Sequence, residues 1–174
     1  GYTMPVSYHE GIQAEYFAVR NDVGIFDVSH MGEFFITGPN ALQFLQQVTI
    51  NDVRKLKVGQ AQYSAMCYVD GGIVDDLILY RKPKGYLMVV NAANIEKDYD
   101  WLSQYVMSDT HLENISRDIS LIALQGPRSR KLLSKLTDVN LEMPFYTFED
   151  GDVSGFSVMV SRTGYTGELG FEIY

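Results

Sequence analysis

Two adjacent aspartates lie inside an apolar strand pattern directly after a glycine turn. The run GGIVDDLILY at residues 71–80 contains Asp75 and Asp76. Because side chains alternate between the faces of a strand, Asp76 shares a face with Ile78 and Tyr80. Asp75 points to the opposite face, which is also apolar. Either the pair closes the turn and faces water, or one carboxylate lies at the edge of a pocket, where an ionised group is costly unless something binds it.

Another carboxylate lies in a strand-like run at the end of the chain. Residues 171–174 follow the glycine-rich segment GYTGELG at 164–170. The glycine spacing is not that of a phosphate-binding loop, and a strand rather than a helix follows it. The segment is therefore predicted to be a hairpin in which the backbone approaches another group closely. By alternation Glu172 points away from Phe171 and Ile173, and taken alone this favours a solvated position.

Few other residues are of types that commonly act as nucleophiles or metal ligands. The single cysteine, Cys67, lies in a strand-like run and is predicted to be a small core residue rather than a nucleophile. One cysteine excludes an internal disulfide and fits a reducing compartment. The three histidines, His9, His30 and His111, are scattered, so no metal-ligand cluster is predicted. His30 is predicted to be a structural, hydrogen-bonded imidazole.

The composition limits the classes of partner. The chain has 174 residues, a net charge of −8, 46% hydrophobic residues and 21% charged residues. This acidic balance argues against binding to nucleic acid or to anionic membranes, and no apolar run is long enough to span a bilayer. The length allows one domain or two small intertwined ones. The first residues resemble neither an initiator segment nor a signal peptide, and the last lie within a strand-like run, so we expect a fragment of a longer protein.

The middle of the chain predicts an antiparallel meander followed by a helix. Three strand-like runs, at residues 60–69, 73–80 and 86–91, are joined by Asp-Gly-Gly and Pro-Lys-Gly turns. Asn94 is then expected to cap a helix that continues to about Met107. The apolar stripe of this helix consists of Ile95, Tyr99, Leu102 and Val106.

Two strand-turn-helix units flank the meander. In each, an apolar strand ends at a Gly-Pro pair, at residues 38–39 and 126–127, and a helical pattern follows. Proline is tolerated in the first turn of a helix because its missing N–H would have no partner there. Either an internal duplication of the sequence or the independent use of the same strand-to-helix turn accounts for the similarity between the two units. The regular alternation of strands and helices that is typical of a doubly wound sheet is absent. The chain is therefore predicted to have an α+β fold.

Four segments together resemble the T-protein family, the aminomethyltransferases of the glycine cleavage system. They are AVR at 18–20 with GIFDVSHMGE at 24–33, GGIVDD at 71–76, VNA at 90–92 with EKD at 96–98, and RTGYTGE at 162–168. The resemblance covers the whole chain and implies the N-terminal half of a three-domain protein. Residues 1–32 and 117–174 would form an incomplete, discontinuous antiparallel folate-binding domain. Residues 33–116 would form an inserted ferredoxin-like domain, and the C-terminal β-barrel domain would be absent.

The resemblance also implies a reaction and its partners. The aminomethyl group carried on the lipoyl arm of the H-protein would be transferred to tetrahydrofolate. The products would be 5,10-methylenetetrahydrofolate, ammonia and dihydrolipoyl H-protein, and no metal or covalent nucleophile is required. A carboxylate in a poorly solvated channel can stabilise an iminium-like cation on this path. Folate and lipoylated H-protein are the expected partners, with no nucleic acid and no membrane. The expected location is the bacterial cytoplasm, or the mitochondrial matrix in a eukaryote.

Residue by residue, the resemblance assigns the catalytic carboxylate to Asp76, with Asp75 as its structural partner. It assigns Glu172 to the pterin, whose ring N–H and exocyclic amino group a single carboxylate can accept together. The remaining folate-binding candidates are Tyr165, Asn91, Tyr80, Ile78, Tyr63 and Met31. For the four of these that would form channel walls, Met31, Tyr63, Ile78 and Tyr80, packing in the core stays an open alternative.

Two other functions within the same superfamily also stay open. One is a folate-binding relative without transferase activity, of the iron–sulfur assembly type, whose Lys-Gly-Cys motif is not found in this chain. The other is the folate domain of a dimethylglycine or sarcosine dehydrogenase, which a flavin module upstream would reveal. Because the family's C-terminal half supplies further folate contacts, the chain alone is expected to be inactive or only weakly active.

Overall fold

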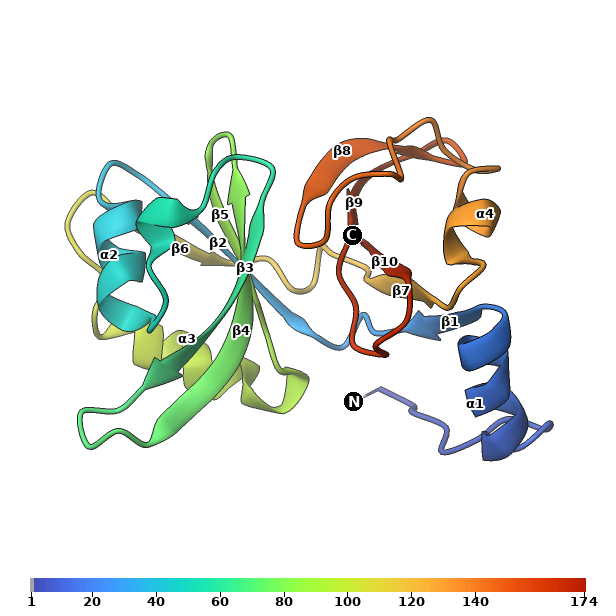
Figure 1. The fold of residues 1–174 in the computed structure, drawn as a ribbon. Helices are drawn as coiled ribbons and strands as arrows, with labels where there is room; N and C mark the ends of the chain where they lie inside the picture. Colours follow the sequence, from blue (N-terminus) through green and yellow to red (C-terminus); the bar gives the residue numbers. More distant parts are fainter. Residues whose placement is uncertain (1) are drawn as a thin grey trace. The chain divides into compact units, whose positions relative to one another are not determined.

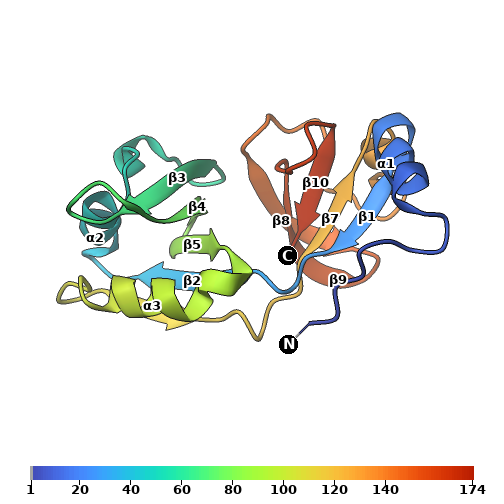
Figure 2. The same ribbon diagram turned by 90° about the horizontal axis from the view of Figure 1, so that it is seen from below.

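The computed structural model describes residues 2–174 and divides into two compact units. Unit 1 consists of Gly1–Ser29 and Ser120–Tyr174, and unit 2 consists of His30–Ile119. Each unit has its own five-stranded sheet, and all the paired strands are antiparallel. Figures 1 and 2 show the two sheets with their helices. The predicted α+β class is confirmed.

Unit 2 contains the predicted meander. Its elements are β2 (Gly32–Thr37), α2 (Ala41–Val48), η1 (Val53–Lys55), β3 (Ala61–Cys67), β4 (Ile73–Lys82), β5 (Gly85–Val90), η2 (Ala92–Asn94), α3 (Ile95–Ser103) and β6 (His111–Asn114). The strand order is β3-β4-β5-β2-β6, so the three predicted strands are neighbours in the sheet. Beyond β5 the sheet continues with β2, which precedes the meander in the chain, and β6 pairs with the far edge of β2.

One face of the unit 2 sheet is covered by both helices. Phe44 of α2 and Leu102 of α3 are completely buried in a single hydrophobic cluster. Leu77 and Leu79 of β4 and Met88 of β5 belong to the same cluster. Their side chains therefore define the helix-covered face, and the alternate residues of these strands point to the opposite face.

Helix α3 ends earlier than its apolar pattern predicts. It stops at Ser103, because the next two N–H groups donate to carbonyls three residues back and so tighten the final turn. Asn94 occupies the N-cap position, but its side chain makes no capping hydrogen bond, which corrects the predicted cap.

Unit 1 is assembled from two stretches of the chain. Its elements are α1 (Ile12–Asn21), β1 (Gly24–Asp27), β7 (Ile122–Gln125), α4 (Ser129–Leu133), β8 (Phe148–Val153), β9 (Phe156–Ser161) and β10 (Gly170–Ile173). The sheet order is β1-β7-β10-β9-β8. Strands β1 and β7, which lie on either side of unit 2 in the sequence, pair directly (Figure 2). Within residues 2–174, no helix is both long enough and apolar enough to cross a bilayer.

The two Gly-Pro corners require glycine for the same reason. Gly38 has φ of 105°, and a Cβ there would lie 2.1 Å from the carbonyl oxygen of Asp109. Gly126 has φ of 130°, and its Cβ would lie 2.5 Å from the carbonyl oxygen of Asp22. Both positions combine a left-handed backbone with a close backbone approach. The helices begin two residues after each proline, so proline precedes the N-cap instead of occupying the first turn.

Candidate functional site

Strand β4 carries Asp76 on the sheet face opposite the helices. Its neighbour Leu77 belongs to the helix-covered core, so Asp76 points to the other face. Tyr63 of β3 pairs with Ile78, and the Tyr63 hydroxyl donates to Asp76 Oδ2 at 2.7 Å. Tyr80 lies on the same face and is completely buried. Four of the predicted site residues therefore lie together, and for Asp76, Ile78 and Tyr80 this is the shared face that strand alternation predicts.

Two more predicted residues lie at the end of the same sheet. Val90 of β5 pairs with Gly32 of β2. Asn91 and Met31, the next residues along each strand, therefore lie at the same end of the sheet as Asp76. Met31 and Asn91 thus lie at the sheet end that carries Asp76, which their distant sequence positions do not by themselves reveal.

The Asn91 side chain joins the two aspartates. Its Nδ2 donates to Asp76 Oδ1 at 2.6 Å and to Asp75 Oδ1 at 2.9 Å. The Asn91 backbone N–H donates to Asp75 Oδ2 at 3.2 Å. Because Tyr63 occupies Oδ2 of Asp76 and Asn91 occupies Oδ1, the Asp76 carboxylate is held at both oxygens. The result is a fixed negative charge on a half-buried surface, and such a charge can stabilise a cation without reorganisation.

Asp75 is 7% exposed and points toward the helix layer. Burial alone would raise the pKa of this carboxyl, but the neighbouring Asp98 and the hydrogen bonds from Asn91 outweigh burial and lower it. Asp75 is therefore an ionised acceptor inside the unit. Its role in the geometry is to orient the amide of Asn91.

Asp98 is the first functional candidate that sequence reasoning missed. It lies on the inner face of α3 and is completely buried. Burial, and then the neighbouring Asp75 carboxylate, raise the pKa of Asp98 to about 7. A signal was available in the sequence, because Asp98 interrupts the apolar stripe between Ile95 and Leu102.

Glu33 of β2 is the second missed candidate. It pairs with Val89, which in turn pairs with Ile78, so Glu33 lies on the same sheet face as Asp76. The side chain is completely buried, and neither carboxyl oxygen accepts a hydrogen bond from any described residue. Burial raises the pKa of Glu33 to about 8. The sequence signal was a single carboxylate within the otherwise apolar strand GEFFIT.

This perturbed carboxyl predicts a pH-dependent stability. Between the ordinary pKa of 4.5 and about 8, the folded state holds a proton on Glu33 that the unfolded chain has lost. Stability attributable to Glu33 is therefore present at low pH and is lost as the pH rises across that window. Glutamine has the same shape and is neutral throughout. We expect Glu33→Gln to raise the free energy of unfolding near about pH 9 by up to about 5 kcal/mol, at about 1.4 kcal/mol per pKa unit.

Urea unfolding of the parent protein and of Glu33→Gln at about pH 5 and about pH 9 measures this change in the free energy of unfolding. Glu113→Gln is the matched control, because Glu113 is exposed on the adjacent strand β6. Equal pH slopes for Glu33→Gln and the parent protein would contradict a protonated Glu33.

Glu172 and Tyr165 lie in unit 1. Phe171 is completely buried in the core of that unit, and Glu172, the next residue of β10, is half-buried on the opposite face. The Thr163 hydroxyl donates a short hydrogen bond to Glu172 Oε2. Burial, and then the Glu172 carboxylate, raise the pKa of Tyr146. Tyr165 is fully exposed at the tip of the loop that precedes β10.

The group that the glycine-rich loop approaches is the side chain of Gln125. A Cβ at Gly164 or at Gly170 would lie 2.2 Å from Gln125 side-chain atoms. Gln125 Oε1 accepts from the Thr166 hydroxyl at 3.0 Å, and its Nε2 donates to the carbonyl of Phe171 at 3.2 Å. The loop that presents Tyr165 is thus anchored to strand β7, which explains the glycines in physical terms.

Gly164→Ala is expected to destabilise the protein by about 1–3 kcal/mol, because the added methyl group overlaps a buried side chain. Shortening Gln125 removes the overlapping atoms. In a double-mutant cycle, Gly164→Ala should therefore cost less in the Gln125→Ala background than in the parent. Thermal unfolding of the four proteins measures the coupling. Additive effects would show that the close approach between Gly164 and Gln125 does not constrain the loop.

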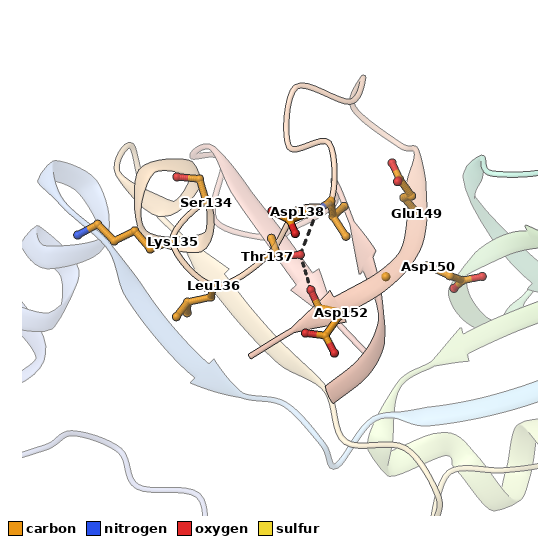
Figure 3. Close-up of a pocket in the computed structure, with 10 residues that line it drawn as sticks. Ser134, Lys135, Leu136, Thr137, Asp138, Glu149, Asp150 and Asp152 are labelled. Atoms are coloured by element: carbon orange, nitrogen blue, oxygen red, sulfur yellow. Dashed lines mark hydrogen bonds between the residues drawn. The ribbon is translucent and has the colours of Figure 1, made fainter. Parts of the chain in front are cut away.

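A surface cavity of about 480 Å³ lies elsewhere in unit 1, between residues 134–139 and 149–152 (Figure 3). Its lining is polar, and the Thr137 hydroxyl donates to the carbonyl of Asp152. It contains none of the predicted site residues. Among the described residues, no group of three or more histidine, cysteine, aspartate or glutamate side chains is arranged to hold a metal ion.

Comparisons with known proteins give the relatives of the chain. Residues 1–174 match the family described as the GCVT N-terminal domain. The aminomethyltransferase of Listeria innocua is 51% identical over 177 residues, covering 100% of this chain and 49% of that protein. The aminomethyltransferase of Anoxybacillus flavithermus is 55% identical over 177 residues, covering 100% of this chain and 48% of that protein. The chain spans about half the length of the curated relatives it matches.

Solved structures show the same fold. The crystal structure of the glycine cleavage system aminomethyltransferase T from Bartonella henselae has a TM-score of 0.85 and 32% identity, and covers 98% of this chain and 46% of that one. A heterotetrameric sarcosine oxidase from Corynebacterium sp. U-96 has a TM-score of 0.63 and 16% identity, with 92% of this chain and 80% of that chain covered. At that identity the second likeness is one of fold alone.

Proposed function

Because this chain belongs to the GCVT N-terminal domain family of aminomethyltransferases, we propose that it is the N-terminal part of a folate-dependent transferase of glycine cleavage. The substrates are aminomethyl-lipoyl H-protein and tetrahydrofolate. The products are 5,10-methylenetetrahydrofolate, ammonia and dihydrolipoyl H-protein. Because the two aminomethyltransferases compared above are bacterial, the cytoplasm is the proposed location.

The observation that carries this proposal is the Asp76 carboxylate, held by Asn91 at one oxygen and by Tyr63 at the other. When the carbon–sulfur bond of the aminomethyl adduct breaks, positive charge develops on the transferred carbon and its nitrogen. A carboxylate that is already oriented stabilises this charge without paying reorganisation energy during the reaction. Asp76 is accordingly the proposed catalytic residue.

Glu172, Tyr165 and Asn91 are the proposed polar and aromatic contacts of the folate. The Glu172 carboxylate offers two acceptor oxygens, which suit the adjacent ring N–H and amino donors of a pterin. Tyr165 presents an exposed ring, and Asn91 offers an amide near Asp76. The apolar walls of the folate channel are assigned to Met31, Tyr63, Ile78 and Tyr80.

The domain organisation is proposed on the same basis. Residues 1–32 and 117–174 form the discontinuous folate-binding domain, and residues 33–116 form the inserted one. The order β4-β5-β2-β6 with helices α2 and α3 on one face supports a ferredoxin-like description of the inserted domain, with β3 as an additional edge strand. Lipoylated H-protein is the proposed macromolecular partner.

The test is to incubate the full-length gene product with aminomethyl-lipoyl H-protein and tetrahydrofolate. We expect methylenetetrahydrofolate and ammonia to form in equal amounts, and only when both substrates are present. Folate-dependent capture of free formaldehyde without any reaction of the H-protein adduct would instead favour the dehydrogenase-type function. Binding of folate with neither reaction would favour a non-catalytic relative.

A further inference from the structure

The part of β4 that carries the aspartate pair is held differently from the rest of that strand. It consists of Val74, Asp75 and Asp76. We infer that Lys97 of helix α3 is a positioning residue for the Asp76 carboxylate, because its ammonium group holds the backbone of this segment. The inference rests on the proposed function, since it assigns Lys97 to the support of the proposed catalytic group.

On the side of β3, the segment contains a β-bulge. The register shifts between Met66 and Cys67. Their partners on β4 are Asp75 and Ile73, so Val74 between them is the extra residue of the bulge. As a result Val74 belongs to the helix-covered core, whereas Ile73 is 69% exposed. A bulge bends its strand and disrupts the ladder locally, so the course of the segment depends on contacts outside the ladder.

On the side of β5, side chains hold the segment where a strand holds the rest of β4. The ladder between β4 and β5 begins at Leu77 and Val90, and the chain after Val90 leads into η2 and α3. Asn91 Nδ2 donates to a carboxylate oxygen of each aspartate. Lys97 Nζ donates to the carbonyl oxygen of Val74 at 2.6 Å. Two side chains from the chain beyond β5 therefore hold the segment on this side.

The contact between Lys97 and Val74 is close to Asp76 along the backbone. Hydrogen bonds from an ionised donor are shorter and about twice as strong as those between neutral groups. The same Nζ lies 3.6 Å from Oδ1 of the buried Asp98, and an ionised carboxylate there favours this position of the ammonium. Because peptide units are planar, a shift of the Val74 carbonyl also moves the backbone that leads to Asp76.

Four variants of the full-length gene product test a positioning role. Lys97→Met keeps an apolar stem without the donor and should lower kcat by about tenfold, because displacement of a catalytic group slows the chemical step. Folate affinity should be unchanged. Lys97→Arg keeps a charged donor and should restore kcat. Lys97→Gln is polar but one bond shorter, so it should lose kcat like Lys97→Met and decides if that variant does not fold. Lys84→Met, in the exposed turn between β4 and β5, is the matched control.

A double-mutant cycle connects the effect to Asp76. If Lys97 acts through that carboxylate, Lys97→Met should cause little further loss of kcat in the Asp76→Asn background. Losses that multiply in the double variant would show that Lys97 affects transfer by another route and would overturn the inference. A parallel loss of kcat and folate affinity in Lys97→Met would also overturn it, because the substitution would then have damaged the site as a whole.

A readout that does not depend on activity is the NMR signal of the Asn91 side-chain amide, which donates to both aspartates. This signal should shift in Lys97→Met and keep its parental position in Lys97→Arg and Lys84→Met. An unchanged signal, or parental kcat, in a folded Lys97→Met protein contradicts the positioning role. If the signal shifts but the parent shows no aminomethyl transfer, the link between Lys97 and the aspartates stands and the proposed function fails. If the parent transfers and the signal does not shift, only the positioning role fails.

Discussion

Replacing Asp76 by asparagine is expected to lower kcat for aminomethyl transfer by roughly 10²–10³-fold, because it removes a preorganised charge opposite the developing cation. The substitution is nearly isosteric, and the amide oxygen that Asp76→Asn introduces can still accept one of the two hydrogen bonds that Asp76 receives from Asn91 and Tyr63. The expected loss is therefore in the chemical step, with little change in the affinity for folate. Steady-state rates with aminomethyl-lipoyl H-protein, combined with calorimetric titration of folate, separate the two quantities.

Asp70→Asn is the matched control for this experiment. Asp70 lies in the exposed turn just before the strand that carries Asp76, and its Oδ1 accepts from the N–H of Gly72. Asparagine can keep that interaction, so the control should retain parental kcat. Parental kcat in the Asp76→Asn protein would show that the chemical step does not depend on this carboxylate. Loss of folate binding in place of kcat would move Asp76 from catalysis to substrate binding.

Substitution of Glu172 is expected to weaken folate binding with a smaller effect on the chemical step. A hydrogen bond to a charged group contributes about 1.5–3 kcal/mol, so Glu172→Gln should raise the Kd for 5-methyltetrahydrofolate by roughly 10–150-fold. Glutamine keeps one acceptor oxygen for the hydroxyl of Thr163, which limits any effect on the strand itself. Glu172→Ala removes both oxygens and should abolish measurable binding. Titration calorimetry on the full-length gene product measures both variants.

Glu149→Gln is the control for Glu172, since Glu149 is an exposed glutamate on β8 of the same sheet. It removes one negative charge from unit 1 without altering β10. If both glutamine variants weakened folate binding equally, the effect would arise from net charge and the proposed pterin contact would be wrong. Unchanged affinity in Glu172→Ala would contradict the contact directly.

The sequence was sufficient to predict those features of the fold that depend on residues close together in the chain. Strand alternation placed Asp76 with Ile78 and Tyr80, and the ladder between β3 and β4 confirms this placement. Turn glycines marked the joins of the meander, whose three strands are neighbours in the sheet. Family motifs then identified Asp76 and Glu172 as candidates. These signals depend on residues a few positions apart, so they can be read without a structure.

Only the tertiary structure showed which groups those residues meet. Gln125 occupies the space that the absent side chains of Gly164 and Gly170 leave open. Asp98 is buried on the inner face of a helix packed on the sheet, and Glu33 is buried two strands away from Ile78. The sequence determined the identity and facing of Asp75, Asp76 and Glu172. Folding determined their protonation and partners, because burial and hydrogen bonding arise between elements that are distant in the chain.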